Sequence, residues 1–320
     1  MNETWIITDE NDENLRLDNY LSELFESFSR SYLQKLIKDG KVKVNDKVQK
    51  PSYKTKLKDK IELVQEEIKE ILPQNIPLDI VWEDENMAVV NKPSDMLTHP
   101  SEIERENTLV NALLFKYGEN LSDLNGYFRK GIVHRLDRNT SGLLMIAKNN
   151  KAHEFLAEQF RAELPSPLWG EGLGVRGHSK TLEKEYLAVV KGAMKENFGV
   201  INFPIGRHPK QPHKMAVVED GKPCITEFKV IKRFKEHTYL ELNLKTGRTH
   251  QIRVHLSHIG HPILNDTLYG AGTSKVKTQE QVLQSYKLKF TKPFSDDTIE
   301  LEIEPDEKIQ KVLKYLENIK

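Results

Sequence analysis

The chain has 320 residues, 30% of them charged, with a formal net charge of zero and a mean hydropathy of −0.59. It contains no apolar run of about 18 residues, which excludes a transmembrane helix, and its single cysteine, Cys224, excludes an internal disulfide framework. The acidic start MNETWIITDENDEN has no hydrophobic signal core, so we expect a cytoplasmic protein.

Charge is distributed unevenly along the N-terminal quarter. Residues 30–60 carry eleven basic and three acidic side chains, a net charge of +8, whereas residues 1–29 and residues 61–86 each carry eight acids and one base. A basic block between acidic flanks is typical of a surface that binds a polyanion. The alternative is a solvated, lysine-rich surface without a partner.

Residues 15–64 are predicted to form one small unit. LRLDNYLSELF has the apolar spacing of a helix, and SRSYLQKLIKDG predicts a second helix that is capped by Ser29 or Ser31 and ends at a left-handed Gly40. KVKVNDKVQK then predicts two short strands around an Asn45-Asp46 turn.

The stretch SRSYLQKLIKDGKVKVN resembles the S4 RNA-binding domain. The resemblance implies that basic side chains of this unit grip RNA phosphates, which supplies affinity but little sequence specificity. The candidate RNA-binding residues are Arg30, Lys35, Lys38, Lys41 and Lys43.

Residues 65–77, acidic and with Pro73 and Pro77, are predicted to be a linker. Residues 78–320 are rich in alternating, strand-like patterns, with helical patches at 107–117, 150–161 and 254–259. A long alternating stretch begins at His237, and we expect a strand to carry HQIR at 250–253. The strands join mostly by hairpins, which predicts an α+β fold with a mixed, largely antiparallel sheet.

The densest polar cluster is GIVHRLDRNTSGLLMIAKN at 131–149. One carboxylate, Asp137, lies between Arg135 and Arg138, ahead of an apolar strand. Neighbouring arginines favour the ionised, nucleophilic form of a carboxylate, so Asp137 is a candidate catalytic residue. The alternative is a salt-bridged turn that joins two strands.

Three segments in order, HRLDRNTSG, EYLAVVKG and GRTHQIRVHLSHIGHPILND, are similar to those of the pseudouridine synthases of the ribosomal large-subunit class. The resemblance covers nearly the whole chain. The stretches IPLDIVWEDENMAVVNKP, GRHPKQPHKMAV and GKPCITEF resemble the type-D members of that class, which modify a stem-loop of 23S ribosomal RNA. The resemblance implies that this chain isomerises uridines in 23S rRNA and that the target base is flipped out of its stack.

The resemblance also implies roles for individual residues. Asp137 is the catalytic aspartate, Tyr186 packs on the target base, and Arg253 pairs with the aspartate. Arg135 fills the gap left by the flipped uridine, and Ile252 points to the strand face opposite Arg253. Further substrate contacts are expected from His134 and Arg138.

We expect neither a cofactor nor a metal, because uridine isomerisation involves no redox change. Four histidines, His250, His255, His258 and His261, allow a metal site in principle, but no carboxylate or cysteine joins them closely and the matching family segment is metal-free. Cys224 is predicted to be a buried, inert thiol. We expect a monomer.

Two alternatives remain open from the sequence. One is a type-C or tRNA-directed synthase of the same class. The other is a non-catalytic RNA-binding protein of ribosome assembly, which the S4 unit fits equally well.

The segment GEGLGVRG at 170–177 matches the G-x-G-x-x-G pattern of dinucleotide-binding loops. A true fingerprint follows a strand and opens a helix, whereas here a predicted helix precedes the glycines and a predicted strand follows. Residues 164–178 are therefore predicted to be an insertion in a surface loop of the catalytic domain.

Overall fold

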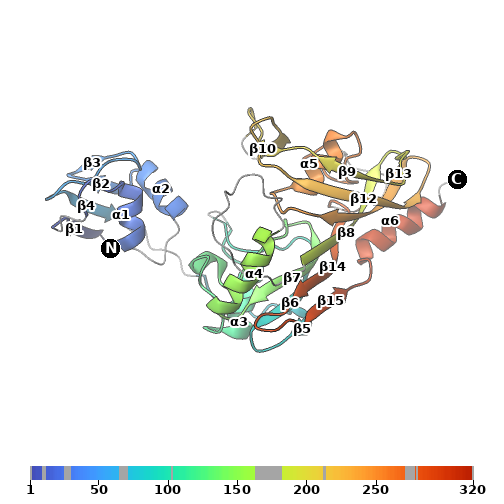
Figure 1. The fold of residues 1–320 in the computed structure, drawn as a ribbon, viewed down its shortest axis with the longest axis horizontal. Coiled ribbons are helices and arrows are strands. Elements are labelled where there is room, and N and C mark those ends of the chain that lie inside the picture. The colour runs from blue at the N-terminus through green and yellow to red at the C-terminus, as the bar shows by residue number, and fades with distance from the viewer. Residues whose placement is uncertain are drawn as a thin grey trace. The chain divides into compact units, whose positions relative to one another are not determined.

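The chain is divided into two units, and each is described by itself (Figure 1). The first comprises Met1–Leu72 and Asp123–Lys130, and the second Pro73–Ser122 and Gly131–Lys320. The computed structural model describes residues 2–8, 12–24, 30–64, 71–101, 104–162, 182–211, 214–270, 278 and 280–318. The insertion predicted at 164–178, with its glycine-rich motif, lies outside these residues.

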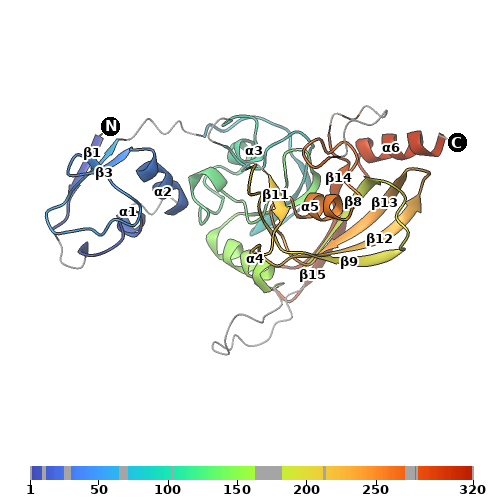
Figure 2. The same cartoon turned by 90° about the horizontal axis from the view of Figure 1, so that it is seen from above.

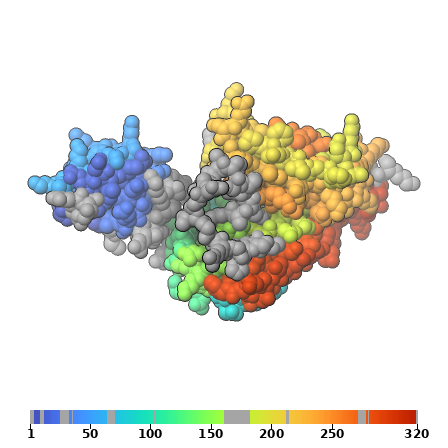
Figure 3. All heavy atoms as spheres, viewed as in Figure 1, coloured from blue at the N-terminus to red at the C-terminus, as the bar shows by residue number. Residues whose placement is uncertain are grey.

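The first unit is a four-stranded antiparallel sheet, in the order β1-β4-β2-β3, with two helices packed against it. Leu17 and Leu21 of the first helix and Leu33 and Ile37 of the second are fully buried in its core. Figure 3 shows these elements as one continuous body in blue. The bounds are β1 (Asn2–Ile6), α1 (Leu17–Leu24), α2 (Arg30–Lys38), β2 (Val42–Val44), β3 (Lys47–Val48), β4 (Lys60–Val64) and a 3-10 helix η2 (Tyr127–Arg129).

The turn residues of this unit adopt the predicted conformations. Gly40 has a φ of 73° after α2, and Asn45 and Asp46, at 50° and 61°, form the two-residue turn between β2 and β3. Two consecutive positive φ angles match the twist of a hairpin. Strand β1 was not predicted, and Ser31 lies inside α2 rather than at its cap.

The second unit is built on a nine-stranded sheet in the order β5-β6-β7-β14-β8-β13-β12-β9, with β15 paired to β14. Among the described strands only β7 and β14 pair in parallel, which confirms the mixed, largely antiparallel α+β prediction. The sheet strands are β5 (Asp79–Glu83), β6 (Met87–Lys92), β7 (Ser141–Ala147), β8 (Leu182–Lys191), β9 (Phe198–Asn202), β12 (Ile225–Arg233), β13 (His237–Leu244), β14 (Leu283–Thr291) and β15 (Thr298–Glu302). A separate hairpin and four helices complete the unit: β10 (Ile205–Arg207), β11 (Met215–Val217), α3 (Leu109–Tyr117), α4 (Asn150–Ala162), α5 (Gln251–His258) and α6 (Glu307–Asn318).

Helices α5 and α6 lie on opposite faces of the central strands. Figure 2 shows α6 beside β14, β8 and β13, where Ile309 and Val312 pack with Leu187. Successive strand residues alternate between faces, so Tyr186 points away from α6. On that second face, His255 of α5 bonds Thr226 of β12 at 2.9 Å. The face of the sheet away from α6 is therefore the one that carries the polar loop residues.

The segment HQIR is helical, so the prediction of a strand through Arg253 was wrong. Strand β13 ends at Leu244, and α5 begins at Gln251. Neighbouring residues on a helix are about 100° apart rather than on opposite faces. Ile252 and Arg253 can therefore face the same pocket, contrary to the expectation for a strand.

No helix in the described part of the chain is both long and apolar enough to cross a membrane.

Gly142 lies where the two halves of the sheet meet. It pairs with Ser285 across the parallel contact of β7 and β14, and its φ is 113°. A Cβ here would overlap the carbonyl oxygen of Ser285 and lie 2.7 Å from its carbonyl carbon. The glycine of the TSG sequence is therefore required for the strands to approach each other.

We expect Gly142→Ala to lower the free energy of unfolding by about 3 kcal/mol, because the methyl group adds both strain and backbone overlap. Urea titration of the purified variant measures this change. Gly118→Ala is the matched control, because Gly118 also has a positive φ, 55°, but a Cβ there meets nothing within 4 Å. Equal losses in the two variants would contradict the close-approach explanation.

Candidate active site

Five of the predicted site residues line one small pocket on the face of the sheet away from α6. They are Arg135, Asp137, Tyr186, Ile252 and Arg253. The remaining lining residues are Leu136, Thr140, Leu244, Arg248, His250, Gln251 and Leu283. The pocket is open to solvent on one side, and its volume is about 60 Å³. Residues far apart in the sequence thus converge on one pocket, which has both charged and apolar walls.

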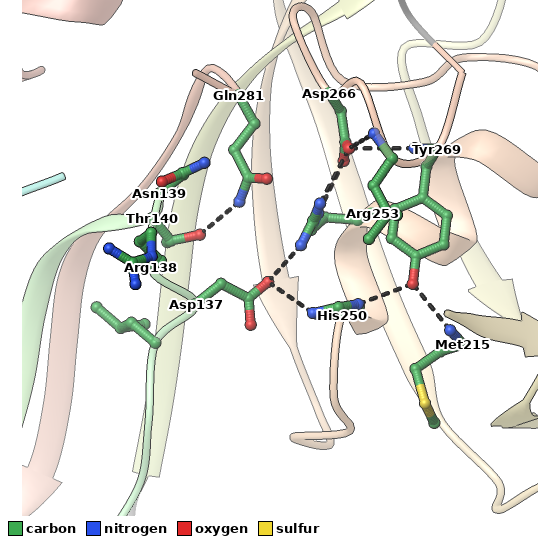
Figure 4. A network of polar contacts seen from close by, with 12 residues as sticks. Asp137, Arg138, Asn139, Thr140, Met215, His250, Arg253, Asp266, Tyr269 and Gln281 are labelled. Atoms are coloured by element: carbon green, nitrogen blue, oxygen red, sulfur yellow. Dashed lines mark hydrogen bonds and ion pairs between the residues drawn. The ribbon is translucent and has the colours of Figure 1, made fainter. Parts of the chain in front are cut away.

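Asp137 is held by two side chains on the same oxygen (Figure 4). Arg253 Nη1 donates to Oδ2 at 3.0 Å, and His250 Nε2 lies 3.7 Å from that atom. Within the described residues both contacts go to Oδ2. The second oxygen, Oδ1, is therefore the one presented to a ligand in the pocket.

Arg253 is shared between two carboxylates. Its Nε and Nη2 bond Asp266 in a bidentate pair, at 2.8 and 3.0 Å, while Nη1 bonds Asp137. Its guanidinium also lies 5.0 Å from the centre of the Tyr269 ring. Burial disfavours the charge, but the hydrogen bonds of Asp266 and Asp137 outweigh it and raise the pKa of Arg253. The guanidinium is thus a permanent, oriented cation beneath Asp137.

His250 is oriented by a hydroxyl relay. Its backbone is left-handed, with a φ of 56°, at the N-terminal end of α5. The Tyr269 hydroxyl accepts from Met215 N at 3.0 Å and lies 2.8 Å from His250 Nδ1. The hydroxyl then donates to Nδ1, which leaves the ring proton on Nε2, toward Asp137. Burial lowers the pKa of His250, which favours this neutral form.

The loop 134–140, here the Asp137 loop, is anchored through its backbone carbonyls. Thr98 Oγ1 donates to Leu136 O at 2.7 Å, and the ammonium of Lys308 on α6 lies 3.2 Å from Asn139 O. Ser94 Oγ donates to the same Asn139 carbonyl, and Gln281 Nε2 donates to Thr140 Oγ1. The loop is therefore tied to three other segments on both sides of Asp137.

Lys92 is the most deeply buried of these anchors, with 0% of its side chain surface exposed. Its ammonium donates to the carbonyls of Pro93, Met96 and Arg138 at 2.7, 2.9 and 3.0 Å. Burial lowers its pKa to about 7. Three carbonyl acceptors satisfy the three protons of the ammonium, so this lysine links β6 to the residue after Asp137.

His134 and Arg138 do not line the pocket. His134 Nε2 accepts from Met145 N at 2.9 Å, and its ring lies 4.8 Å from that of Phe160. Arg138 forms ion pairs with Glu104 and Asp95. These contacts account for both side chains structurally, and substrate contact is not needed to explain them.

The predicted RNA-binding residues lie on α2, on β2 and, for Lys41, between the two. Lys38 is exposed, and Lys41 and Lys43 are partly exposed. Lys38 lines a concave surface of about 550 Å³ with Arg16, Gln34, Gln49, Lys50, Pro51 and Ser52. Arg30 and Lys35 belong to α2, but their side chains lie outside what the structure describes.

Three of the four histidines considered for a metal use ring nitrogens in other contacts, His250 with Tyr269 as described above. His255 bonds Thr226 and the Phe203 carbonyl, both at 2.9 Å, and His261 bonds the Lys191 carbonyl at 3.0 Å. Across the described ranges, no group of three or more histidines, cysteines or acids has the geometry to hold a metal ion. Cys224 is buried, and burial raises its pKa.

The sequence did not single out several residues of the site: Lys92, Arg248, Asp266, Tyr269 and Gln281. Arg248 lies in the quoted GRTHQIR segment, and Asp266 ends the quoted PILND. No spacing rule distinguishes them, because their partners are brought together by the fold. Only the density of polar residues in GRTHQIR was a usable signal.

Comparison with known proteins matches the chain to two family models, and these contain the residues described above. Residues 86–258 match the model of the RNA pseudouridylate synthase family, and residues 15–61 match that of the S4 domain. The first match contains Asp137, Tyr186 and Arg253, and the second contains the basic block. Asp266 and Lys308 lie beyond the matched range.

Relatives extend this similarity over most of the chain. An "Uncharacterized RNA pseudouridine synthase" of Aquifex aeolicus (strain VF5) is 40% identical, covering 95% of either chain. A "Ribosomal large subunit pseudouridine synthase D" of Vibrio parahaemolyticus is 38% identical over 89% of this chain and 86% of its own. The solved structure of "Human RNA Pseudouridylate Synthase Domain Containing 1" shares the fold, with a TM-score of 0.56 and 23% identity over 77% of this chain and 96% of its own.

The partly buried His134 predicts an acid-sensitive fold. Burial lowers the pKa of His134 from 6.5 to about 3. Below pH 6.5 the histidine is therefore protonated in the unfolded chain but stays neutral in the folded chain. The free energy of unfolding therefore falls as the pH drops below 6.5, and it is lower by about 2 kcal/mol at about pH 5.

We expect His134→Gln, which keeps an acceptor for Met145 N, to make the pH dependence of urea unfolding shallower by that amount. His258→Gln removes an exposed histidine and is the control. A His134→Gln protein with the wild-type pH dependence would show that His134 does not supply it.

Proposed function

Since this chain belongs to the RNA pseudouridylate synthase family, we propose that it converts uridines of 23S ribosomal RNA to pseudouridine, with Asp137 as the catalytic residue. The observation that carries the proposal is the single pocket formed by Asp137, Tyr186 and Arg253. Family membership decides for an enzyme over a non-catalytic RNA-binding protein. The S4 domain supplies the RNA-binding part.

The ribosomal target is supported by the names of relatives. Proteins called "Ribosomal large subunit pseudouridine synthase D" from Vibrio cholerae and Escherichia coli are 37% and 39% identical to this chain, over 95% and 88% of its length. At 95% of the chain, the first of these matches includes most of the N-terminal unit as well as the pocket. These names favour the large-subunit rRNA over a tRNA substrate and type D over type C.

The proposed reaction is an isomerisation. The N1–C1′ bond of uridine breaks, the uracil turns, and a C5–C1′ bond forms. The proton at C5 is lost and N1 gains one, so atoms and electrons balance without a redox partner. Nicotinamide, flavin and metal ions are therefore not required for this chemistry, and we propose that the enzyme uses none.

In this proposal Asp137 Oδ1 faces the reacting nucleotide while Arg253 and His250 hold Oδ2. Fixing one oxygen orients the other without reorganisation during the reaction. Tyr186, 6% exposed on β8, packs against the uracil and assists removal of the C5 proton. Ile252 contributes an apolar wall to the same pocket.

A stacked uridine must leave its helix to reach this pocket. Arg135 is exposed on the Asp137 loop at the pocket rim. We assign to it the filling of the gap left by the flipped base, because a guanidinium stacks on bases and bonds their edges.

The proposal divides the work between two parts of the chain. Residues 15–64 grip the RNA through the basic block, residues 65–77 link the domains, and residues 78–320 carry out the chemistry, with an inserted loop at 164–178. Lys38, Lys41 and Lys43, whose side chains the structure describes, are proposed to contact phosphates, and we propose that Arg30 and Lys35 join them. The enzyme is proposed to act as a cytoplasmic monomer.

Asp137→Asn should fold and bind rRNA but form no pseudouridine, because the amide cannot replace a carboxylate at Oδ1. Pseudouridine is isomeric with uridine, so the measurement is carbodiimide labelling and primer extension on 23S rRNA from a deletion strain. The deletion strain is complemented with the wild-type gene, the Asp137→Asn gene or an empty vector. The position at which only the wild-type gene restores modification is the target uridine. Restored modification by Asp137→Asn would remove Asp137 from its catalytic role.

Replacing Lys38, Lys41 and Lys43 together by Gln should weaken rRNA binding and lower the slope of log K against log salt by about two, with the rate at saturating RNA unchanged. The matched control replaces Lys229, Lys232 and Lys245, each paired with an acid in the second unit. Filter binding over a salt series compares them. If both triple variants weakened rRNA binding equally, the basic block would not be the RNA-binding surface.

A further inference from the structure

Arg248 belongs to the wall of the catalytic pocket but takes no part in the Asp137 network. It lies in the turn between β13 and α5, and its partly buried side chain lines the pocket beside Asp137 and Tyr186. No contact of its guanidinium with Asp137 or Asp266 accompanies those of Arg253. Its presence there is therefore not explained by positioning the carboxylate.

The backbone beneath Arg248 is rigidly built. Gln251 Oε1 accepts from Arg248 N at 3.0 Å and from Thr246 Oγ1 at 2.8 Å. Gln251 Nε2 donates to Ile225 O and Thr226 Oγ1, both at 3.0 Å, and the glutamine is 3% exposed. One of these hydrogen bonds holds the backbone of Arg248, and the other three hold the glutamine that accepts it.

The Nε atom of this guanidinium has no acceptor among the described residues. Arg248 Nε is buried with no hydrogen-bond partner in the part of the chain that the structure describes. Arg138 and Arg253, by contrast, are each paired with two carboxylates. A buried donor on a cation is costly when unsatisfied, so its position favours a ligand that brings an anionic acceptor.

The charge of the pocket wall points to the same kind of ligand. Its charged residues are three arginines, Arg135, Arg248 and Arg253, and one acid, Asp137. Arg253 is neutralised by Asp137 and Asp266, whereas Arg135 and Arg248 have no ion pair with a described residue. The open pocket therefore presents unbalanced positive charge around a carboxylate that is already paired.

We infer that Arg248 is a phosphate-binding residue for the target nucleotide, taking a phosphodiester oxygen of the RNA through Nε and a terminal nitrogen. The guanidinium fork matches a phosphate in bidentate geometry. The phosphodiesters on the 5′ and 3′ sides belong to the same ribose whose C1′ bond is exchanged. Arg248 thus fixes the sugar while Asp137 and Tyr186 address the base, an inference that rests on the proposed function.

The test uses a synthetic stem–loop RNA that contains the uridine mapped on 23S rRNA. Two further versions carry a neutral methylphosphonate on the 5′ or the 3′ side of that uridine. In each version the 2′-hydroxyl next to the methylphosphonate is replaced by 2′-O-methyl. A phosphodiester RNA with the same 2′-O-methyl group is the control for that version. The proteins carry Asp137→Asn so that the RNA stays unmodified, with Arg248, Arg248→Gln or Arg248→Lys, and their Kd values are compared.

Arg248→Gln should weaken binding of the control RNA by about 10-fold and lower the salt slope by about one. One of the two methylphosphonates should weaken binding to the Arg248 protein by the same factor. It should not weaken binding to the Arg248→Gln protein any further, and this lack of additivity identifies the phosphate that Arg248 contacts. Arg248→Lys, which keeps the charge but not the fork, should fall between them. Lys245→Gln, three residues away and paired with Glu227, should bind all RNAs like the parent.

Equal weakening of the Arg248 and Arg248→Gln proteins by both methylphosphonates would overturn the inference. Should Arg248→Gln fail to fold, as judged by thermal unfolding, the Arg248→Lys comparison decides by the same criterion. Turnover of the unmodified stem–loop by the wild-type enzyme is measured first. Its absence would refute the proposed function, whereas turnover without phosphate coupling would refute the role of Arg248 alone.

Discussion

The buried guanidinium of Arg253 is the contact on which the rest of the site depends. It is 8% exposed and bonds two carboxylates, one on the Asp137 loop and one, Asp266, on the segment after α5. A charge buried this deeply is tolerated only when it is paired and hydrogen-bonded. Each partner therefore constrains the other two, and helix α5 is fixed relative to the loop ahead of β7.

That constraint lies where the two halves of the large sheet join. Strands β7 and β14 make its one described parallel contact, directly after the Asp137 loop, and Gly142 permits their close approach. Lys92 and Lys308 tie the loop carbonyls to β6 and α6. The carboxylate is thus carried by irregular backbone, which gives it access to the pocket, while side chains from regular elements give it the rigidity that the backbone lacks.

The polar residues around the pocket separate into a closed network and an open one. Asp137, Arg253, Asp266, Tyr269 and His250 are linked by hydrogen bonds and ion pairs, and burial lowers the pKa of His250, which favours its neutral form. Arg135 and Arg248 are left with their charges directed to the pocket. In the proposed function, the closed network orients the reacting carboxylate, and the open one binds the anionic phosphates of the nucleotide.

The sequence by itself determined the local features: the helices of the first unit, the Asn45-Asp46 turn, the alternation of the sheet strands and the polar loop around Asp137. Each depends on residues within a few positions of one another. Tertiary structure decided that HQIR begins a helix, that His134 faces Met145, and that Asp266, Tyr269 and Arg248 join the site. The Asp137–Arg253 pair spans 116 positions, and the family resemblance alone indicated it. Strand register and helix docking set such contacts, and no local pattern encodes them.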